Sequence, residues 1–299
     1  MKTYFLVNPI AGRGRGRKYI KLISEILKSR SEHDELFVTS RKGEAKEFAA
    51  SIRNTECVLL CIGGDGTLNE IINGLGVHSD VILSVLPIGS GNDFARSINQ
   101  KKSIYELVTE LSKPDFIKID IGQIYFQHED KSIIHLFLNS CGIGFDALSA
   151  YFSNQKSMLK GLPLYLKAVI KSLLKYKSFL FEGSFDSFTS ITGQKMMLSI
   201  GNGQTSGGGF YLTPKAQIND GLLDIAIAEH LNFLKILFLL PKAITGKYIH
   251  TKHVEYLKFE KANVKIEPGN YIHSDGEVLS TSVKEVEIEI IKSSLKVLR

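Results

Sequence analysis

The sequence predicts an α/β domain followed by an all-β domain of the sandwich type. Up to Asp120, strand-like runs alternate with segments of helical periodicity, a pattern typical of a parallel sheet with helices on its faces. Beyond that residue, short strands of alternating polarity dominate, as in antiparallel sandwiches. The 299 residues are enough for two domains of about 150 residues each.

The first domain is expected to alternate between strands and helices along its whole length. In such a sheet, ligands bind beyond the carboxyl ends of the strands. The loops at those ends are rich in Gly, Asn, Asp, Ser and Thr, and they comprise residues 8–16, 39–43, 63–67 and 87–93. The strands are predicted over residues 4–7, 35–39, 58–62 and 81–86, and the helices over residues 17–28, 44–53 and 68–74.

The second domain is expected to consist mainly of strands. One segment with helical periodicity, residues 162–176, interrupts them. The strands are predicted over residues 118–125, 133–139, 179–185, 195–202, 222–228, 256–259, 263–267 and 286–291.

The composition is that of an ordinary globular protein, 43% hydrophobic and 23% charged. No apolar run approaches the roughly 18 residues of a membrane-spanning helix, and the N-terminal segment is too short for a signal peptide. Cys57, Cys61 and Cys141 lack metal-binding spacing, and their odd number argues against a disulfide framework. We therefore expect a cytoplasmic protein. Its net charge of +6 fits an anionic partner, either a nucleotide or an acidic membrane surface.

The most informative segment is Gly63-Gly64-Asp65-Gly66-Thr67, which lies between an apolar strand and the start of a predicted helix. A glycine-rich turn at a helix N-terminus is a site for phosphate, because the backbone can come close and free N–H groups point at the ligand. The carboxylate of Asp65 would repel a phosphate unless a metal ion or a well-placed donor neutralises it. The turn therefore predicts nucleotide chemistry.

Two further loops have both a functional and an ordinary interpretation. The loop of residues 8–16 lacks the spacing of a P-loop, so it is either a different phosphate loop or a flexible basic turn. In Gly89-Ser90-Gly91-Asn92-Asp93, the N–H and hydroxyl groups can face phosphate, and Asp93 either holds a cation or caps the next helix. Two acid-containing glycine loops after neighbouring strands favour the functional interpretation.

The loops 63–67 and 89–93 are followed by Leu68-Asn69-Glu70 and Phe94-Ala95-Arg96, respectively. Together these segments closely resemble the diacylglycerol kinase catalytic-domain family, and its soluble bacterial lipid kinases in particular. The resemblance extends through nearly the whole chain, and the ordered series of motifs is far more specific than any single one. Further matches are Asn8-Pro9 with Gly12, Thr39, Gly43-Glu44-Ala45, Asp120-Ile121-Gly122, Asn139, residues 142–146, Asn202, residues 207–210, residues 220–224 and Asp275-Gly276-Glu277.

The resemblance implies ATP-dependent phosphorylation of a lipid hydroxyl in a cleft between two domains. It assigns residues 1–122 to an α/β ATP-binding domain, onto which a C-terminal tail of about residues 284–299 packs back. Residues 123–283 form the β-sandwich that takes the lipid. The implied ATP and Mg²⁺ contacts are Asn8, Pro9, Ile10, Ala11, Gly12, Thr39, Gly64, Asp65, Gly66, Thr67, Leu68, Asn69, Glu70, Ser90 and Asp93.

By the same resemblance, Glu277 is the general base and Asp275 and Asp65 are the other catalytic acids. A carboxylate within reach of the acceptor hydroxyl suits the role of base, and Asp65 is expected to organise the nucleotide with its magnesium. Asp275-Gly276-Glu277 is also a strong hairpin signal, and one segment can serve both purposes.

A structural Mg²⁺ site is also implied, held by Asp220 and the backbone carbonyls of Gln217 and Leu222. From the residues alone, Asn219-Asp220-Gly221 is an ordinary turn.

Residues 162–176 resemble a basic amphipathic surface helix, with Lys167, Lys171 and Lys175 on one face. This face either meets a membrane surface or is simply solvated. A lipid kinase must reach acceptors in a bilayer, so peripheral membrane contact is a hypothesis.

The preferred hypothesis is an ATP-dependent lipid kinase acting on diacylglycerol, another glycerolipid or a sphingoid base. One alternative is an NAD kinase, which shares the GGDGT loop but usually lacks the Asn92-Asp93-Phe94-Ala95-Arg96 segment. The other is a nucleotide-binding regulatory protein without catalysis, which the retention of Glu277, Asp65 and Asp93 argues against. The family also allows a homodimer, and no nucleic-acid partner is expected.

Overall fold

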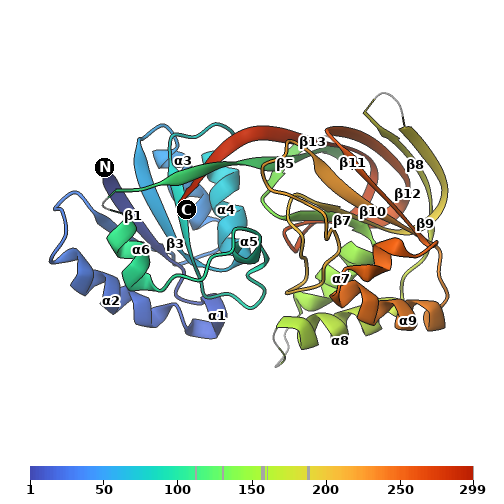
Figure 1. Ribbon diagram of the computed structural model, residues 1–299, viewed down its shortest axis with the longest axis horizontal. Coiled ribbons are helices and arrows are strands. Elements are labelled where there is room, and N and C mark those ends of the chain that lie inside the picture. The colour runs from blue at the N-terminus through green and yellow to red at the C-terminus, as the bar shows by residue number, and fades with distance from the viewer. Residues whose placement is uncertain (112, 130, 156–158, 160, 187–188, 299) are drawn as a thin grey trace.

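The computed structural model describes residues 1–111, 113–129, 131–155, 159, 161–186 and 189–298. Arg299, the last residue of the predicted tail, lies outside these ranges. The chain forms an α/β lobe and a strand-rich lobe side by side, as Figure 1 shows. The α/β domain and the β-sandwich-like domain predicted from the sequence are thereby confirmed.

The α/β lobe is built on a parallel sheet in the order β2-β1-β3-β4. Every residue of β3 is buried, as expected for a strand covered on both faces. Hydrophobic residues of α3 and α4 pack on one face of the sheet, and those of α2 and α6 pack on the other. The strands are β1 (Lys2–Val7), β2 (Glu35–Val38), β3 (Cys57–Gly63) and β4 (Ile82–Pro87), and the helices are α1 (Ala11–Gly14), α2 (Arg17–Leu27), α3 (Glu44–Ile52), α4 (Asp65–Leu75), α5 (Asp93–Ser97) and α6 (Ile104–Glu110).

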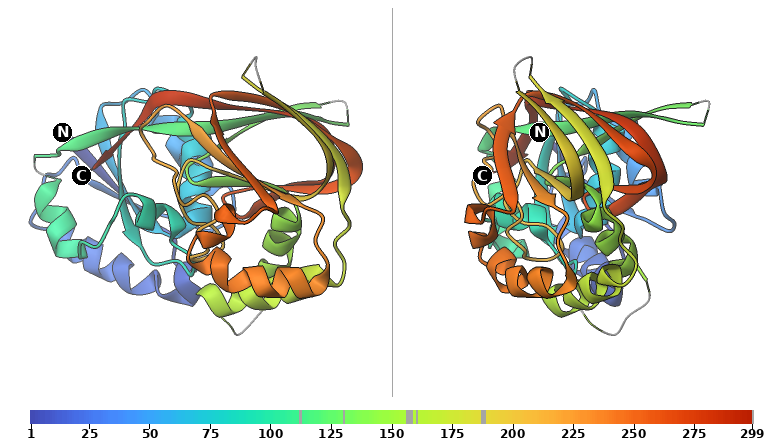
Figure 2. Two further views of the ribbon diagram at one scale, coloured as in Figure 1. Left: turned by 45° about the vertical axis from the view of Figure 1, so that its right-hand side comes forward. Right: turned by 90° about the vertical axis from the view of Figure 1, so that its right-hand side faces the viewer.

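The second lobe is an antiparallel sheet that curves round a hydrophobic core (Figure 2). β9 and β12 each pair with both β7 and β8, so these four strands enclose the core. The alternating burial along β8 reflects this arrangement, with Phe179, Phe181 and Phe185 pointing inward. The strands are β5 (Phe116–His128), β6 (Lys131–Phe137), β7 (Ser140–Gly144), β8 (Phe179–Phe185), β9 (Thr189–Gly201), β10 (Leu223–Glu229), β11 (Val254–Phe259), β12 (Lys261–Ser274) and β13 (Glu277–Leu298).

Three α-helices cover one side of this lobe: α7 (Phe145–Ser153), α8 (Gly161–Leu173) and α9 (Phe233–Ile244), with a 3₁₀ turn at Lys247–His250. Their inner faces share one hydrophobic cluster. The sequence predicts a helix at α8 but predicts neither α7 nor α9. α9 is apolar over most of its length and carries only Lys235 and Lys242 as charged residues, so charges mark its solvent-facing side only weakly.

The strands β5 and β13 connect the two lobes. β13 pairs with β12 in the sandwich, runs beside β5 over most of its length, and ends parallel to β4 through Lys296 and Val297. The predicted domain boundaries, after residue 122 and before residue 284, fall inside these shared strands, so that division stays a prediction. Because β5 and β13 run through both lobes, they fix the lobes relative to each other.

Candidate active site

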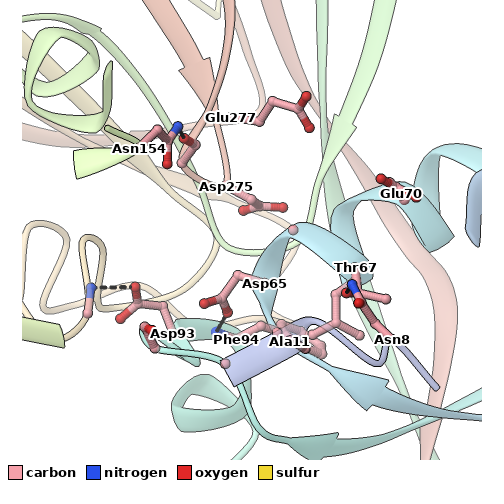
Figure 3. Close-up of a pocket in the computed structure, with 18 of the residues that line it drawn as sticks. Asn8, Ala11, Asp65, Thr67, Glu70, Asp93, Phe94, Asn154, Asp275 and Glu277 are labelled. Atoms are coloured by element: carbon pink, nitrogen blue, oxygen red, sulfur yellow. Dashed lines mark hydrogen bonds between the residues drawn. The ribbon is translucent and has the colours of Figure 1, made fainter. Parts of the chain in front are cut away.

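A cleft of about 730 Å³ lies between the lobes. The loops after β1, β2, β3 and β4 line it on the α/β side, and the 138–140, 206–208 and 275–277 segments line it on the other side. Figure 3 shows Glu277 and Asp275 on one side of the pocket, with Asp65 and Asp93 on the other. The carboxyl ends of the parallel strands and the hairpin of the sandwich therefore meet here.

Most of the residues predicted to contact ATP line this cleft, and two of them do not. Pro9 lies in the same loop but is not part of the lining. Asn69 is 1% exposed and donates from Nδ2 to Asp275 Oδ2 at 3.2 Å, so it joins the lobes instead of facing the cleft. The predicted residues in the lining are Asn8, Ile10, Ala11, Gly12, Thr39, Gly64, Asp65, Gly66, Thr67, Leu68, Glu70, Ser90, Asp93, Asp275 and Glu277.

The glycines of the two phosphate loops are required by close backbone packing. A Cβ on Gly64 would lie 2.9 Å from the Cα of Gly89, and a Cβ on Gly89 would lie 2.7 Å from the Cα of Gly64. The first loop is tied to the same place, because Arg15 donates from Nη2 to the carbonyl of Ile88 at 2.8 Å. Three loops distant in sequence thus form one continuous floor with backbone N–H groups at the start of α4.

Asp65 is the first residue of α4 and already has backbone donors. Its Oδ2 accepts from Asn92 N at 2.6 Å, and its Oδ1 accepts from Phe94 N at 3.4 Å. Burial, together with the nearby Asp93 carboxylate, nevertheless raises the pKa of Asp65 well above that of an ordinary aspartate. The donors hold the side chain in place without cancelling its charge, so a cation remains favourable beside it.

Asp93 connects the glycine loop to the opposite lobe. Its Oδ2 accepts from Gly208 N at 2.7 Å, and its Oδ1 accepts from Thr205 Oγ1 at 3.0 Å and from Arg96 Nη1 at 2.9 Å. Burial raises the pKa of Asp93, and these donors oppose that rise. Asp93 therefore acts first as a link between the lobes, and this role was not visible in the sequence.

The two carboxylates come together around Gly91, where an added Cβ would lie 2.8 Å from Asp65 Oδ2 and 3.3 Å from Asp93 Oδ2. Among the residues that the structure describes, no cluster of three His, Cys, Asp or Glu side chains could hold a metal ion. One or two carboxylates completed by phosphate oxygens is the usual way proteins bind Mg²⁺ at a nucleotide. The pair fits an ion that arrives with ATP.

Asp275 and Glu277 lie in one hairpin but in different environments. Asp275 accepts from the backbone N–H groups of Leu138, Asn139 and Ser140, all at 2.9 Å. Burial raises its pKa, and these N–H donors oppose that rise. Both oxygens of Asp275 are thus occupied in holding the β6–β7 segment, which favours a positioning role over proton transfer.

Glu277 is the acid left available for chemistry. Its side chain is 30% exposed and contacts the ammonium of Lys42, and no backbone N–H of the described ranges donates to it. The hairpin loop Asp275-Gly276 has positive φ at both residues, as a two-residue turn requires, and Ser274 pairs with Glu277 across it. The predicted hairpin is confirmed, and it points Glu277 into the cleft.

Several residues of the cleft were missed from the sequence. Lys42, which contacts Glu277 from the α/β lobe, carries no motif signal. Tyr165 lines the cleft from α8 and donates to Asp146 Oδ1 at 2.9 Å. Asn139 and Gly208 lie within the motifs named above, which assign them no role. Their contacts are with Asp275 and Asp93, respectively, which are distant from them in sequence.

The comparisons with known proteins agree with this architecture. The family model described as "Diacylglycerol kinase catalytic domain" matches residues 2–124, and the one described as "YegS C-terminal NAD kinase beta sandwich-like domain" matches residues 139–299. This chain is a member of the diacylglycerol kinase catalytic-domain family.

Two relatives match this chain over almost their whole length. A Bacillus subtilis (strain 168) protein named "Putative lipid kinase YtlR" is 30% identical, with 93% of this chain and 94% of that protein covered. A diacylglycerol kinase of Mycobacterium tuberculosis (strain ATCC 25618 / H37Rv) is 27% identical, with 100% and 95% covered.

Two solved structures show the breadth of the fold. A diacylglycerol kinase from Bacillus anthracis str. Sterne superposes with a TM-score of 0.71 at 20% identity, covering 99% of this chain and 96% of that one. An Archaeoglobus fulgidus NAD kinase in complex with ATP gives 0.55 at 13% identity, covering 100% and 94%. At these identities the likeness concerns the fold alone, and the fold does not choose between lipid and NAD as acceptor.

The structural magnesium site that the family implies lies away from the cleft, at the turn before β10. Asp220 Oδ2 accepts from Lys258 Nζ at 2.7 Å, and Asp220 Oδ1 accepts from Leu222 N at 3.1 Å. The same ammonium lies 3.1 Å from the buried Asp224 Oδ2 and 3.4 Å from the Lys215 carbonyl. This arrangement fits an ammonium rather than Mg²⁺, and the metal site of Gln217, Asp220 and Leu222 stays a prediction.

We expect the substitution Lys258→Met to destabilise the protein, because it leaves two carboxylates without their counter-charge. The loss should be roughly 1–3 kcal/mol of unfolding free energy, below that of a fully buried pair since Lys258 is 32% exposed. Thermal unfolding would measure it, with Lys292→Met in the exposed pair to Glu260 as the control that changes little. A chelator should leave the wild-type midpoint unchanged. A midpoint that falls with chelator and recovers with Mg²⁺ would instead support the predicted metal site.

Proposed function

We propose that this protein transfers the γ-phosphoryl group of ATP to the hydroxyl group of a lipid such as diacylglycerol. The family supports a kinase, and the named relatives include diacylglycerol kinases. The observation that carries the proposal is the position of Glu277: it is a partly exposed carboxylate that lines the same cleft as the glycine loops, on the opposite wall. Phosphoryl transfer needs this combination of a nucleotide cradle and a group that orients the acceptor.

On the α/β side, the loops cradle the triphosphate. The N-terminus of α4 presents free N–H groups next to Gly64, and its dipole favours the negative charge of phosphate. Asn8 donates to Thr67 Oγ1 at 2.9 Å and so fixes the first loop against this helix. Mg²⁺ bound with ATP would neutralise the phosphate oxygens, and Asp65 is the residue placed to hold it.

On the opposite side, Glu277 acts on the acceptor. The hydroxyl oxygen attacks the γ-phosphorus, the bond from that phosphorus to the bridging oxygen of the β-phosphate breaks, and ADP leaves. The hydroxyl proton passes to the Glu277 carboxylate. Asn154 donates to the carbonyl of Gly276 at 2.8 Å and thereby holds the turn that carries the base.

The acceptor is proposed to be a lipid because the named relatives include lipid kinases. The apolar residues Leu138, Leu164 and Tyr165, which are among those lining the acceptor side of the cleft, fit such an acceptor. Since ATP is a cytosolic substrate, we place the reaction in the cytoplasm at the inner face of the membrane.

The deciding experiment incubates the protein with γ-labelled ATP and Mg²⁺, and separately offers diacylglycerol, a total lipid extract, sphingosine and NAD. Label in phosphatidic acid or another phospholipid supports the proposal. Label in NADP alone would replace it with the NAD kinase hypothesis. ATP binding without a labelled product from any acceptor would favour the regulatory hypothesis.

A further inference from the structure

Helix α9 carries apolar residues on both its inner and its outer face. Ile236 and Leu239 are 7% and 9% exposed and pack into the cluster under the helices. On the outer side, Leu234 and Phe238 are 72% and 69% exposed. A helix that is apolar all round is expected inside a protein or in a membrane, not on a wet surface. Phe233 and Leu237, half exposed, complete the outer face.

The neighbouring helix α8 extends this surface. Ile170 is 50% exposed, and Leu174, just after the helix, is 78% exposed. Figures 1 and 2 show α8 and α9 along the same edge of the lobe, and both pack on one hydrophobic cluster. The α8–α9 surface is here defined as the exposed apolar residues Ile170, Leu174, Phe233, Leu234, Leu237 and Phe238.

Lysines border the α8–α9 surface. Lys167 and Lys171 are exposed on α8, Lys175 is exposed just after its end, and Lys235 is exposed on α9. The ammonium of Lys242 lies 4.7 Å from the ring of Phe238, at the edge of the apolar residues. Apolar side chains rimmed by lysines match the interface of a bilayer that contains anionic lipids. A second copy of the chain would bring the same lysines against each other.

Helix α8 also reaches the cleft with its first turns. Leu164 and Tyr165, in the first turns of α8, line the cleft on the acceptor side. Tyr165 also lines a separate, mainly apolar cavity of about 70 Å³ between α8, α9 and the strands. Contact of the α8–α9 surface with a bilayer would therefore place the acceptor side of the cleft next to the membrane. No helix of the described ranges is long and apolar enough to cross a bilayer, so such contact would be peripheral.

We propose that the α8–α9 surface inserts its apolar side chains into the interface of an anionic membrane, with α9 as the inserting helix. This rests on the proposed function for its biological purpose, but its test does not need catalysis. Helix α8, which the sequence singled out, then supplies mainly the charge, and α9 supplies the apolar contact.

The test compares vesicle binding of the full-length wild type with that of the variant Leu234→Glu/Phe238→Glu. Vesicles of phosphatidylcholine with phosphatidylglycerol, and of phosphatidylcholine alone, are used in co-sedimentation. We expect the wild type to prefer the anionic vesicles and the variant to bind them at least tenfold more weakly. The matched control is Tyr105→Glu/Ile134→Glu, which changes residues 64% and 63% exposed on α6 and β6 and should bind like the wild type.

A water-dissolved short-chain diacylglycerol separates this inference from the proposed function. The variant should phosphorylate that acceptor like the wild type and lose activity only toward diacylglycerol in vesicles. Equal vesicle binding by wild type and variant would overturn the inference, as would a wild-type dimer that the variant converts to a monomer, because the surface would then join two copies. If no lipid is phosphorylated but vesicle binding still depends on α9, the proposed function fails and the membrane surface stands.

Discussion

The substitution Glu277→Gln should lower kcat for lipid phosphorylation by about 10²–10⁴-fold, the usual range for a lost general base. Glutamine has the same shape and the side chain is partly exposed, so the fold should be unchanged. The KM for ATP should stay close to that of the wild type, because the nucleotide loops lie on the other wall of the cleft. Steady-state kinetics with both substrates varied would measure the two effects.

Lys42→Ala is the matched control for this prediction. It removes the same contact with Glu277 but leaves the carboxylate in place. Lys42 is 78% exposed, so the pair contributes at most about 1 kcal/mol, and kcat should fall by no more than about fivefold. If both variants lose activity equally, the ion pair matters rather than the base. If Glu277→Gln turns over like the wild type, Glu277 has no role in proton transfer.

The succession of strands and helices along the first domain and the place of the phosphate loops could be predicted because both follow from local patterns. The run of Cys57–Gly63 is apolar throughout, as a strand buried on both faces must be, and Gly64 follows it where the backbone turns into α4. The Asp275-Gly276 turn was likewise visible, since its dipeptide alone specifies the hairpin. These features depend on few residues, all close in sequence.

The individual roles of the acids could not be predicted in the same way. Asp93 and Asp275 have the same side chain as Asp65, yet their oxygens are taken up by Gly208, Thr205 and the 138–140 backbone. Those donors are more than a hundred residues away in the chain, so no window of sequence contains the information. The same reason explains why the contact between Lys42 and Glu277 was missed.

Helix α9 shows a different limit of the sequence. Its inner face packs on the hydrophobic cluster, and its outer face is also apolar, so few charged residues mark a solvent-facing side. In α8 the lysines mark that side, and the sequence predicts the helix. The apolar outer face of α9 explains both why its sequence carries few charges and why we propose it as a membrane-binding surface.

The substitution Asp65→Asn should stabilise the protein at alkaline pH while removing most of its activity. Burial and the Asp93 carboxylate raise the pKa of Asp65 in the folded state, so the unfolded state gives up this proton at lower pH. The wild type therefore loses stability as the pH rises from about 4, where an unfolded aspartate ionises, to the folded pKa of Asp65, whereas asparagine has no proton to lose. A tenfold difference in acidity between the folded and unfolded states corresponds to about 1.4 kcal/mol, so we expect a gain of at least about 1 kcal/mol at pH 8.5 that shrinks as the pH falls below about 7 and is almost absent at about pH 3.5. Thermal unfolding without Mg²⁺, across that pH range, would measure the difference.

Two opposing effects limit this gain, and both are smaller. The N-terminus of α4 favours a negative charge at Asp65 by about 0.3–1 kcal/mol, and asparagine keeps only one acceptor oxygen, which suffices for the short bond from Asn92 N but not for the longer one from Phe94 N. The control is Asp93→Asn, which relieves the same repulsion but weakens bonds from Gly208, Thr205 and Arg96, and it should lower the midpoint. If Asp65→Asn also lowers the midpoint at pH 8.5, the Asp65 charge is already neutralised by its donors. The Asp65 carboxylate would then need no cation to balance its charge.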